Sequence, residues 1–344
     1  MAGEALDGLP AIIGRTPLIE LENLVPGFRG RVLAKMERFN PGGSIKDRTA
    51  LAVVRGAIRR GRLHPGRSVV VESSSGNLGV GLAQLCRYHG LRFVCVVDVK
   101  ATSKNRSLLR AYGAELEVVT VPDEETGEYL PARLRRVREI VERTPEAFWP
   151  DQYANPDNPR AHRRTMAEID RALGGRLDYL FVSVGTFGTL RGCAEYIRGR
   201  GLRTRVIGVD AVGSVIFGQP PAPRLLPGHG AGIRPPLADA ALADDVLHIS
   251  DAESVAGCRH LVEREGILAG GSSGAVTAAL LRYHRRLPAN ATCVLIYPDG
   301  GDRYLDTIYD DEWVRRHLGD VRQPRREPEP EPAELTGEAV GVNG

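Results

Sequence analysis

The sequence predicts an α/β protein with parallel, doubly wound sheets, and three observations lead to this fold class. Short runs rich in β-branched residues alternate with runs that carry apolar residues at helical spacing, which is typical of parallel sheets covered by helices. Three of the strand-like runs lead directly into turns rich in glycine and serine. The chain has 344 residues, enough for two domains with a large buried core.

The first half of the chain begins with a lead-in at residues 1–10 and then alternates between strands and helices. Helices are expected from about residue 46 to residue 60, from the turn at residue 79 to about residue 89, and at residues 103–112. Gly61 and Gly113 directly follow two of these helices, and glycine there signals a helix C-terminus. We expect strands near residues 18–21, 32–39, 68–71, 93–97 and 116–119.

The second half repeats the pattern after an acidic loop and a basic helix at residues 130–143. A turn-rich connector at residues 149–159 is the best candidate for a boundary between two lobes. The loop at residues 220–236, rich in proline and glycine, is long enough to be functional. From about residue 322 the composition predicts disorder. Strands, with helices between them, are expected near residues 179–184, 205–210, 246–249 and 293–297.

Composition excludes several kinds of protein. The formal net charge is +3 and no basic block occurs, so composition gives no reason to expect nucleic acid as a partner. The five cysteines are scattered through apolar segments without metal-ligand spacing, which argues against both a zinc site and a disulfide framework. The sequence contains neither a signal peptide nor an apolar run of membrane-spanning length, so we expect a cytoplasmic protein without a membrane partner.

The most informative stretch is NPGGSIKDR at residues 40–48. Its proline and two glycines make a tight turn, and Ser44 followed by Asp47 predicts a capping box at the start of a helix. Lys46 then lies on the first helical turn, where the helix dipole lowers the pKa of an amine and favours a neutral nucleophile. The chain has only four lysines, so a lysine here suggests chemistry that arginine cannot do, such as Schiff-base formation. The alternative is an ordinary exposed lysine after a turn.

Three turns rich in glycine and serine are the second functional signal. They occupy residues 73–79, 185–189 and 270–274, each between a strand and a helix. Exposed amides at a helix N-terminus bind anions, although such turns can also serve only to pack a helix on a sheet. Neither a dinucleotide-binding GxGxxG motif nor a P-loop is present. Three such turns, one helix-start lysine and no set of metal ligands suit pyridoxal 5′-phosphate, a cofactor with one phosphate and one aldehyde.

Four motifs carry a resemblance to a known family. The stretches NPGGSIKDR, SSSGNLG, GTFGT and GGSSGA resemble, in this order, motifs of the cysteine synthase / cystathionine β-synthase family of fold type II pyridoxal-phosphate enzymes. The resemblance runs from about Gly14 to Asp302 and implies two doubly wound parallel α/β lobes with the cofactor between them. The implied parts are a segment at residues 1–45 that crosses to the large lobe, a small substrate-binding lobe at 46–150, a large cofactor-binding lobe at 151–318 and a disordered tail at 319–344.

The same resemblance assigns roles to individual residues. It implies Lys46 as the catalytic Schiff-base lysine, Asn77 beside the phenolic oxygen of the cofactor and Ser272 at its ring nitrogen. Two residues depart from the cysteine synthase pattern, since Leu78 replaces a threonine and Phe187 replaces a glycine. The cofactor phosphate is expected in a cup formed by Gly185, Thr186, Phe187, Gly188 and Thr189. The substrate α-carboxylate is expected on Ser74, Ser75, Gly76, Asn77 and Gln152.

One branch of the family is more similar to this chain than cysteine synthase itself. ESSSGNLG, AYGAELEVV, FWPDQYANP, GVDAVGSVIFG and LAGGSSGA resemble enzymes of 2,3-diaminopropionate biosynthesis, which join O-phospho-L-serine to L-glutamate. Arg133 and Tyr153 fall where this branch places phosphoserine-recognition groups, and the alternative for Arg133 is a surface charge. The resemblance also implies a homodimer that acts on small amino-acid substrates, in siderophore or antibiotic biosynthesis.

Two other functions stay open at this point. A synthase of the cysteine or cystathionine type would use sulfide or homocysteine, and Leu78, which lacks the threonine hydroxyl, argues against the reaction of acetylserine with sulfide. A regulator that binds the cofactor but has lost catalysis belongs to a different class. The presence of Lys46, Asn77 and Ser272 together argues against it.

Overall fold

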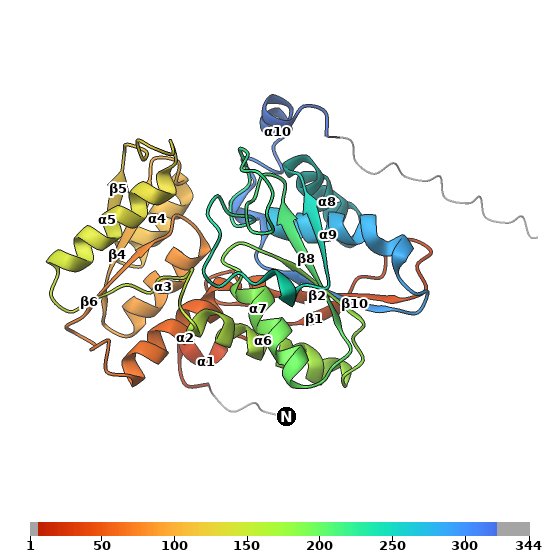
Figure 1. Cartoon of the computed structure of the whole chain (residues 1–344), viewed down its shortest axis with the longest axis horizontal. Helices are drawn as coiled ribbons and strands as arrows, with labels where there is room; N and C mark the ends of the chain where they lie inside the picture. Colours follow the sequence, from red (N-terminus) through yellow and green to blue (C-terminus); the bar gives the residue numbers. More distant parts are fainter. Residues whose placement is uncertain (1–5, 322–344) are drawn as a thin grey trace, which may run out of the picture.

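The computed structural model describes residues 6–321, which form two α/β lobes that lie side by side (Figure 1). The predicted disorder of the tail concerns residues 322–344, which lie outside the described residues. Within residues 6–321 no helix is long and apolar enough to cross a bilayer, and no group of histidine, cysteine and acidic side chains is placed to hold a metal ion.

The larger lobe is built on a six-stranded sheet with the order β1-β2-β10-β7-β8-β9. All neighbouring strands are parallel except β1, which runs antiparallel to β2. Valine, isoleucine and leucine dominate the central strands, because branched side chains pack well on a pleated surface. The strands are β1 (Leu18–Glu20), β2 (Arg31–Met36), β7 (Tyr179–Ser183), β8 (Arg205–Ala211), β9 (Asp245–Ile249) and β10 (Thr292–Tyr297).

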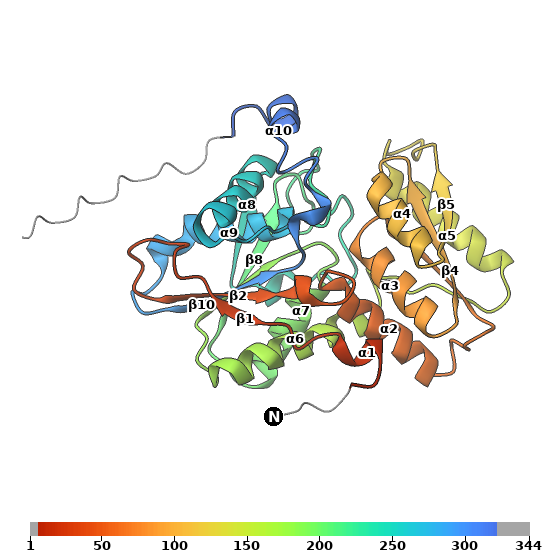
Figure 2. The same cartoon turned by 180° about the vertical axis from the view of Figure 1, so that it is seen from behind.

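Helices cover both faces of this sheet (Figure 2). Successive strand residues point to opposite faces, so Phe181 and Leu295 share a hydrophobic cluster with α8 and α9, whereas Leu180 and Val294 share one with α6 and α7. A short α1 precedes the sheet, and α10 follows it. The helices are α1 (Leu9–Ile12), α6 (Asp157–Leu173), α7 (Gly188–Gly199), α8 (Asp251–Glu265), α9 (Gly271–Tyr283) and α10 (Asp311–Leu318).

The smaller lobe is built on a four-stranded parallel sheet with the order β5-β4-β3-β6. One face, which includes Val70 and Val97, packs on α2, α3 and α4, and the other face packs on α5 through Val137. The strands are β3 (Val69–Ser73), β4 (Arg92–Asp98), β5 (Glu115–Val119) and β6 (Ala147–Phe148), and the helices are α2 (Lys46–Arg59), α3 (Asn77–Tyr88), α4 (Ser103–Ala111) and α5 (Tyr129–Arg143).

The structure confirms the predicted α/β class with parallel sheets, and several local details differ from the prediction. The turn at residues 270–274 lies between α8 and α9, not between a strand and a helix. The strand expected at residues 32–39 ends at Met36, and Glu37–Phe39 form a short 3₁₀ helix in which Glu37 is buried. The two-residue strand β6 lies in a segment for which the sequence predicts no strand. Two residues are too few to show the alternation of apolar and polar side chains that identifies a strand.

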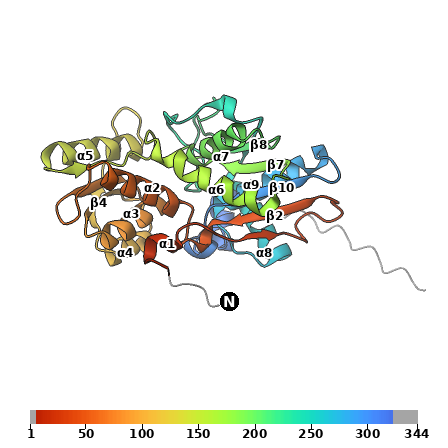
Figure 3. The ribbon, with the colours of Figure 1, turned by 90° about the horizontal axis from the view of Figure 1, so that it is seen from below.

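The carboxyl ends of the inner strands of both sheets face a common region between the lobes. In the large lobe β2 leads to the turn before Lys46, β7 leads to residues 185–189, and β10 leads to Asp299; in the small lobe β3 leads to residues 73–79. The helix α2 lies between the lobes, in contact with α6 on one side and α3 on the other (Figure 3). Open α/β sheets bind ligands outside the carboxyl ends of their strands, so this region is the candidate site.

Candidate active site

Lys46 is the first residue of α2 and directly follows a tight turn. Gly43 adopts φ +83° in that turn, a conformation that glycine adopts without steric cost. The predicted capping box between Ser44 and Asp47 is wrong. Asp47 Oδ2 accepts a hydrogen bond from the Gly42 amide at 2.5 Å, and Ser44 Oγ accepts one from the Lys46 amide at 3.2 Å. Asp47 therefore closes the preceding turn instead of capping the helix.

The Lys46 amine has no hydrogen bond or ion pair to any other residue in 6–321. Burial lowers the pKa of this amine, and the charge of Asp299 acts in the opposite direction. Lys35 is buried as well, but its Nζ lies 2.7 Å from Glu168 Oε2, so its charge is balanced. An unpartnered amine with a lowered pKa is suited to act as a nucleophile and as a base. Among the buried lysines, only Lys46 has these properties.

Residues 185–189 form a cup at the N-terminus of α7, and together with Lys46 and Gly228 they line a small cavity. The amides of residues 185–187 donate no hydrogen bond within the described part of the chain. A methyl group on Gly188 would lie 2.1 Å from Asn158 Oδ1, so the backbone approaches α6 more closely than any side chain would allow. Free amides at a helix N-terminus attract an anion, and the cup is therefore suited to a phosphate.

Phe187 occupies the position in the cup where the family pattern has glycine. Its φ is +69°, in the left-handed region, which costs a non-glycine residue about 1–3 kcal/mol. Its ring is buried in the core of the large lobe, 5.7 Å from the ring of Phe217. The cup backbone thus keeps a conformation typical of glycine, and the added ring packs in the core of the large lobe.

A buried polar network lies behind the cup. Asn158 Nδ2 donates to Thr186 Oγ1 at 3.0 Å, and His162 Nε2 lies 3.1 Å from Thr49 Oγ1 and 3.4 Å from Thr189 Oγ1. Burial holds the pKa of His162 well below its usual range, and nearby positive charges add to this effect. Because Thr186 accepts from Asn158, its own hydroxyl proton is free to point into the cup. The network therefore orients the cup for binding an anion.

The serine-rich turn after β3 reaches the large lobe through Asn77. Ser74 Oγ accepts a hydrogen bond from the Gly79 amide at 2.9 Å, which closes the turn, and Gly76 precedes the first residue of α3. Asn77 Nδ2 donates to Asp299 Oδ2 at 2.8 Å, and Arg303 Nη1 donates to Asn77 Oδ1. The structure therefore places Asn77 next to Asp299, whose negative charge raises the pKa of Lys46 against the effect of burial.

Asp299 joins the three functional segments. Its backbone pairs with Ser44 beside the lysine, its side chain accepts from Asn77, and its carbonyl accepts from the Gly270 amide at 3.3 Å. Burial raises the pKa of its carboxyl group, and its Oδ1 has no partner among the described residues. Ser272, in the first turn of α9 after Gly270, is buried, and its hydroxyl makes no hydrogen bond to another described residue. The lysine turn, the asparagine and the third glycine turn thus meet at one residue, Asp299, the first and third through its backbone and the asparagine through its carboxylate.

The predicted substrate-binding residues lie around the small-lobe turn. Gln152 Nε2 donates to the Ser73 carbonyl at 3.4 Å. Arg133 Nε lies 3.2 Å from Asp98 Oδ2, and its Nη1 donates to Ser75 Oγ at 3.3 Å. The Arg133 side chain is only 14% exposed, so its guanidinium packs against the turn and does not extend into solvent. Tyr153 directly follows Gln152; its pKa is raised by burial, while Arg133 has the opposite effect.

Sequence reasoning missed four residues that shape this site: Asn158, His162, Asp299 and Arg303. Asp299 directly follows the last predicted strand, which is the signal that located the other segments, so it could have been found. Asn158 lies in the predicted turn-rich connector at residues 149–159 and His162 just after it, and no local pattern there identifies a contact with the cup. Arg303 lies beyond the last recognised motif.

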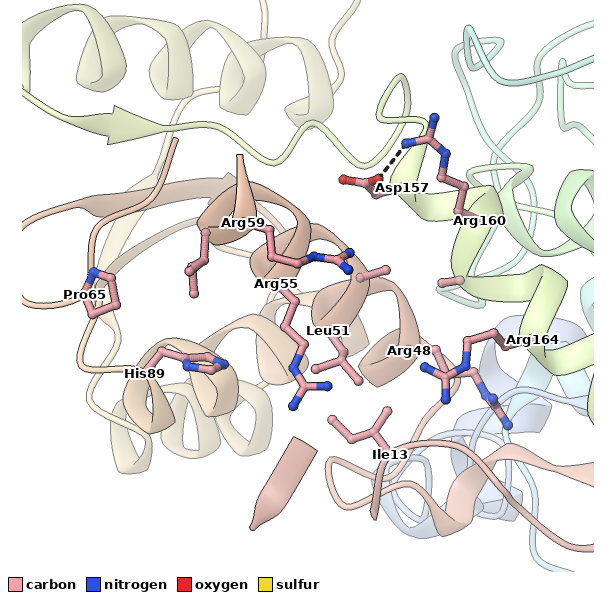
Figure 4. Close-up of a pocket in the computed structure, with 13 residues that line it drawn as sticks. Ile13, Arg48, Leu51, Arg55, Arg59, Pro65, His89, Asp157, Arg160 and Arg164 are labelled. Carbon is pink, nitrogen blue, oxygen red and sulfur yellow. Dashed lines mark hydrogen bonds and ion pairs between the residues drawn. The ribbon is translucent and has the colours of Figure 1, made fainter. Parts of the chain in front are cut away.

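A separate groove of about 540 Å³ opens between α2 and α6 (Figure 4). Arg55, Arg59 and Arg164 extend around it, all three exposed and without an ion-pair partner in the described chain. Arg160 is paired with Asp157 at 3.0 Å. An exposed arginine stays hydrated, so the absence of an ion-pair partner costs little folding free energy. None of the predicted site residues lines this groove.

Comparisons with known proteins give a consistent result. A family model described as "Pyridoxal-phosphate dependent enzyme" matches residues 9–299. The chain is 47% identical over 305 residues to an N-(2-amino-2-carboxyethyl)-L-glutamate synthase of Ralstonia nicotianae. It is 45% identical over 308 residues to a protein of the same name from Cupriavidus metallidurans. Each alignment covers 88% of this chain and 90% of the relative.

Solved structures resemble the fold over nearly the whole chain. The crystal structure of O-ureido-L-serine synthase matches with a TM-score of 0.83 and 33% identity, covering 90% of this chain and 96% of that one. The O-acetylserine dependent cystathionine β-synthase from Helicobacter pylori matches with a TM-score of 0.82 and 32% identity, covering 90% of this chain and 100% of the other.

Proposed function

Because this chain belongs to the pyridoxal-phosphate dependent enzyme family, we propose that it joins O-phospho-L-serine to L-glutamate by β-replacement. The products would be N-(2-amino-2-carboxyethyl)-L-glutamate and phosphate. The predicted family, cofactor and enzyme class, a pyridoxal-phosphate dependent synthase, are confirmed. The observation that carries the proposal is the unpartnered Lys46 amine, which lines one cavity with a cup of free amides and lies close to Asp299.

The residues present fit pyridoxal 5′-phosphate. Lys46, Asn77, Ser272 and the cup at residues 185–189 would hold it, and the close approach of Gly188 to Asn158 leaves the cup amides uncovered. When bound, this cofactor acts as the electron sink for chemistry at the α- and β-carbons of an amino acid. Ser272 offers a hydroxyl rather than a carboxylate near the ring nitrogen, so it cannot balance a full positive charge there. We infer that the sink is moderated, which favours prompt loss of the β-substituent.

Lys46 is the group that moves the proton. Its amine, with a pKa lowered by burial, would take the α-proton of the donor and later return a proton to the α-carbon of the product. Asp299 acts on the amine as a nearby negative charge that opposes the effect of burial. Burial thus favours the neutral amine that can take a proton, and Asp299 favours the charged form that returns one.

The small-lobe turn would bind the donor. Ser74, Ser75, Gly76 and Asn77, with Gln152 beside them, present backbone and side-chain donors for an α-carboxylate at a helix N-terminus. Arg133 and Tyr153 lie at the edge of this turn and would contact the phosphoryl group. We keep the division into a substrate-binding lobe at residues 46–150 and a cofactor-binding lobe at 151–318 as part of this proposal.

Mass spectrometry of the products tests the reaction directly. The holoenzyme is incubated with phosphoserine or acetylserine, each combined with glutamate, sulfide or homocysteine. We expect the glutamate adduct from phosphoserine as the main product. Cysteine or cystathionine as the main product would support the alternative synthases, and no product from any pair would support the catalytically inactive regulator.

We also propose a homodimer and a reducing, cytoplasmic setting. All five cysteines are buried and unpaired, as expected where thiols stay reduced. The dimer rests on resemblance to the family alone. Sedimentation at micromolar concentration tests it, and a monomer there would remove the proposal.

A further inference from the structure

A long loop between β8 and β9, residues 212–237, packs against the phosphate cup. The Gly230 amide donates to the Val184 carbonyl at 2.7 Å, directly before the cup. The Leu237 amide donates to the Tyr153 carbonyl at 3.2 Å. The loop is thus tied to both the cofactor side and the predicted substrate side of the site, so charged residues on it are placed to meet a ligand.

Arg224 is an arginine of this loop that lies against Gly230, the residue that bonds to Val184 before the cup. Its Nη1 donates to the His229 carbonyl at 3.4 Å and would lie 2.9 Å from a methyl group on Gly230. Its Nε is buried and has no hydrogen-bond partner. Its guanidinium lowers the pKa of Tyr153, although burial dominates and raises it. Arg224 thus contacts the segment of the loop that bonds to the residue before the cup, and its charge acts on Tyr153, the side chain that is predicted to contact the donor.

The charge of Arg224 is not balanced within residues 6–321, where it forms no ion pair. The neighbouring His229 cannot supply a negative charge, and burial lowers the pKa of its imidazole to about 4, so it is neutral. Burying part of a guanidinium without a counter-charge raises the free energy of the folded state. By contrast, Arg133 is paired with Asp98, and the exposed Arg59 in the α2–α6 groove keeps its hydration. The imbalance at Arg224 calls for an anionic ligand.

We propose that Arg224 is a specificity-determining residue that binds the phosphoryl group of the donor. This inference rests on the proposed function, in which that group leaves as phosphate. A phosphoryl group carries about −1.5 to −2 charges at pH 7, more than Arg133 can meet while Asp98 neutralises it. A guanidinium presents two parallel donors that match phosphate oxygens. Arg224 supplies the missing cation from the loop between β8 and β9.

Donor kinetics of the holoenzyme test the assignment. The variants are Arg224→Gln, Arg224→Lys and, as a matched loss of one exposed charge, Arg59→Gln. Phosphate release from phosphoserine and acetate release from acetylserine are measured, each with glutamate as acceptor. We expect Arg224→Gln to raise the KM for phosphoserine by about one to two orders of magnitude. The KM for acetylserine and the visible spectrum of the cofactor should stay unchanged, Arg224→Lys should recover part of the loss, and Arg59→Gln should behave as wild type.

The outcomes separate this inference from the proposed function. Wild-type enzyme that releases no phosphate from phosphoserine would refute both the reaction and the assigned ligand. If the wild-type enzyme releases phosphate from phosphoserine and Arg224→Gln has an unchanged KM for phosphoserine, the inference is refuted and the proposed function stands. Equal losses with both donors would show that Arg224 only supports the loop. Inorganic phosphate gives a check without turnover, because its inhibition of the enzyme should weaken in Arg224→Gln and not in Arg59→Gln.

Discussion

The two sides of the candidate site are held in different ways. On the large-lobe side, the cup threonines contact Asn158 and His162, both buried, and Gly188 packs tightly on α6. On the small-lobe side, Ser75 is held only by partly exposed groups, with Asn105 Nδ2 at 3.0 Å from its carbonyl and Arg133 Nη1 at 3.3 Å from its hydroxyl. The cofactor side is thus organised before any ligand binds, whereas the substrate side has donors that a ligand can engage. Prior organisation lowers the entropic cost of binding, so changes on the two sides should affect different ligands.

Lys46 lies where the two sides meet, and its removal should have the largest effect. Lys46→Ala removes an amine that has no partner within residues 6–321 and that is suited to act as nucleophile and base, so we expect activity to fall by at least about 10³-fold. Borohydride reduction followed by peptide mass spectrometry should attach the cofactor to Lys46 in the wild type and nowhere in the variant. Lys104→Ala, which removes an exposed lysine 3.6 Å from Asp306, is the control. Reducible cofactor in the Lys46→Ala protein would falsify the assignment.

Glu72 tests the small-lobe side through stability. It is buried beneath the serine-rich turn, where it accepts from the Ser73 amide at 2.7 Å and from Trp149 Nε1 at 3.2 Å, and burial raises its pKa to about 7. The folded pKa lies above the unfolded value, so this group favours folding below about pH 4.5 and loses that contribution as pH rises to 7. The shift corresponds to about 3 kcal/mol.

We therefore expect Glu72→Gln to remove the loss of folding stability that Glu72 causes between about pH 4.5 and pH 7. Urea unfolding at pH 5 and pH 8 should show a smaller fall in the free energy of unfolding for the variant than for the wild type. Asp47 also has a pKa raised to about 7, but it is present in both proteins and cancels in the difference. The same pH dependence in both proteins would show that Glu72 is not the group that titrates.

The sequence located the parts of this site that are continuous along the chain. The residue 185–189 cup directly follows a strand and Lys46 begins a helix after a glycine turn, so turn chemistry and helix-start rules identify them. Asp299 contacts Asn77, more than two hundred residues away, and the Arg224 loop bonds to Val184 about forty residues before it, which no local pattern reveals. The capping box failed for a related reason, because Asp47 has two possible amide partners and only the folded turn decides between them.

Two asparagines, one on each side, provide a matched test of the comparison. Asn158→Ala leaves Thr186 without its donor in a buried setting, a loss of about 1–3 kcal/mol, so the dissociation constant of the cofactor should rise by about one order of magnitude or more. Asn105→Ala removes a contact at the edge of the small-lobe turn and should leave cofactor binding unchanged, while the KM for the donor rises a few-fold. Fluorescence titration of the apoenzyme measures the first quantity and donor kinetics the second. Equal weakening of cofactor binding in both variants would show that the two sides of the site do not affect different ligands.

Arg133 should show a smaller effect than Arg224, because its charge is already shared. Asp98 lies 3.2 Å from Nε, so a phosphoryl group gains less from Arg133 than from an unpaired arginine. We expect Arg133→Gln to raise the KM for phosphoserine by only about three- to tenfold, less than Arg224→Gln, and to leave acetylserine unaffected. Asp98→Asn should have the opposite effect, since it frees the guanidinium and lowers the KM for phosphoserine. The double variant then measures the coupling between the two residues. A loss in Arg133→Gln as large as that in Arg224→Gln, or no gain in Asp98→Asn, would mean that Asp98 does not limit Arg133 and that the phosphoryl group is held from the small-lobe side.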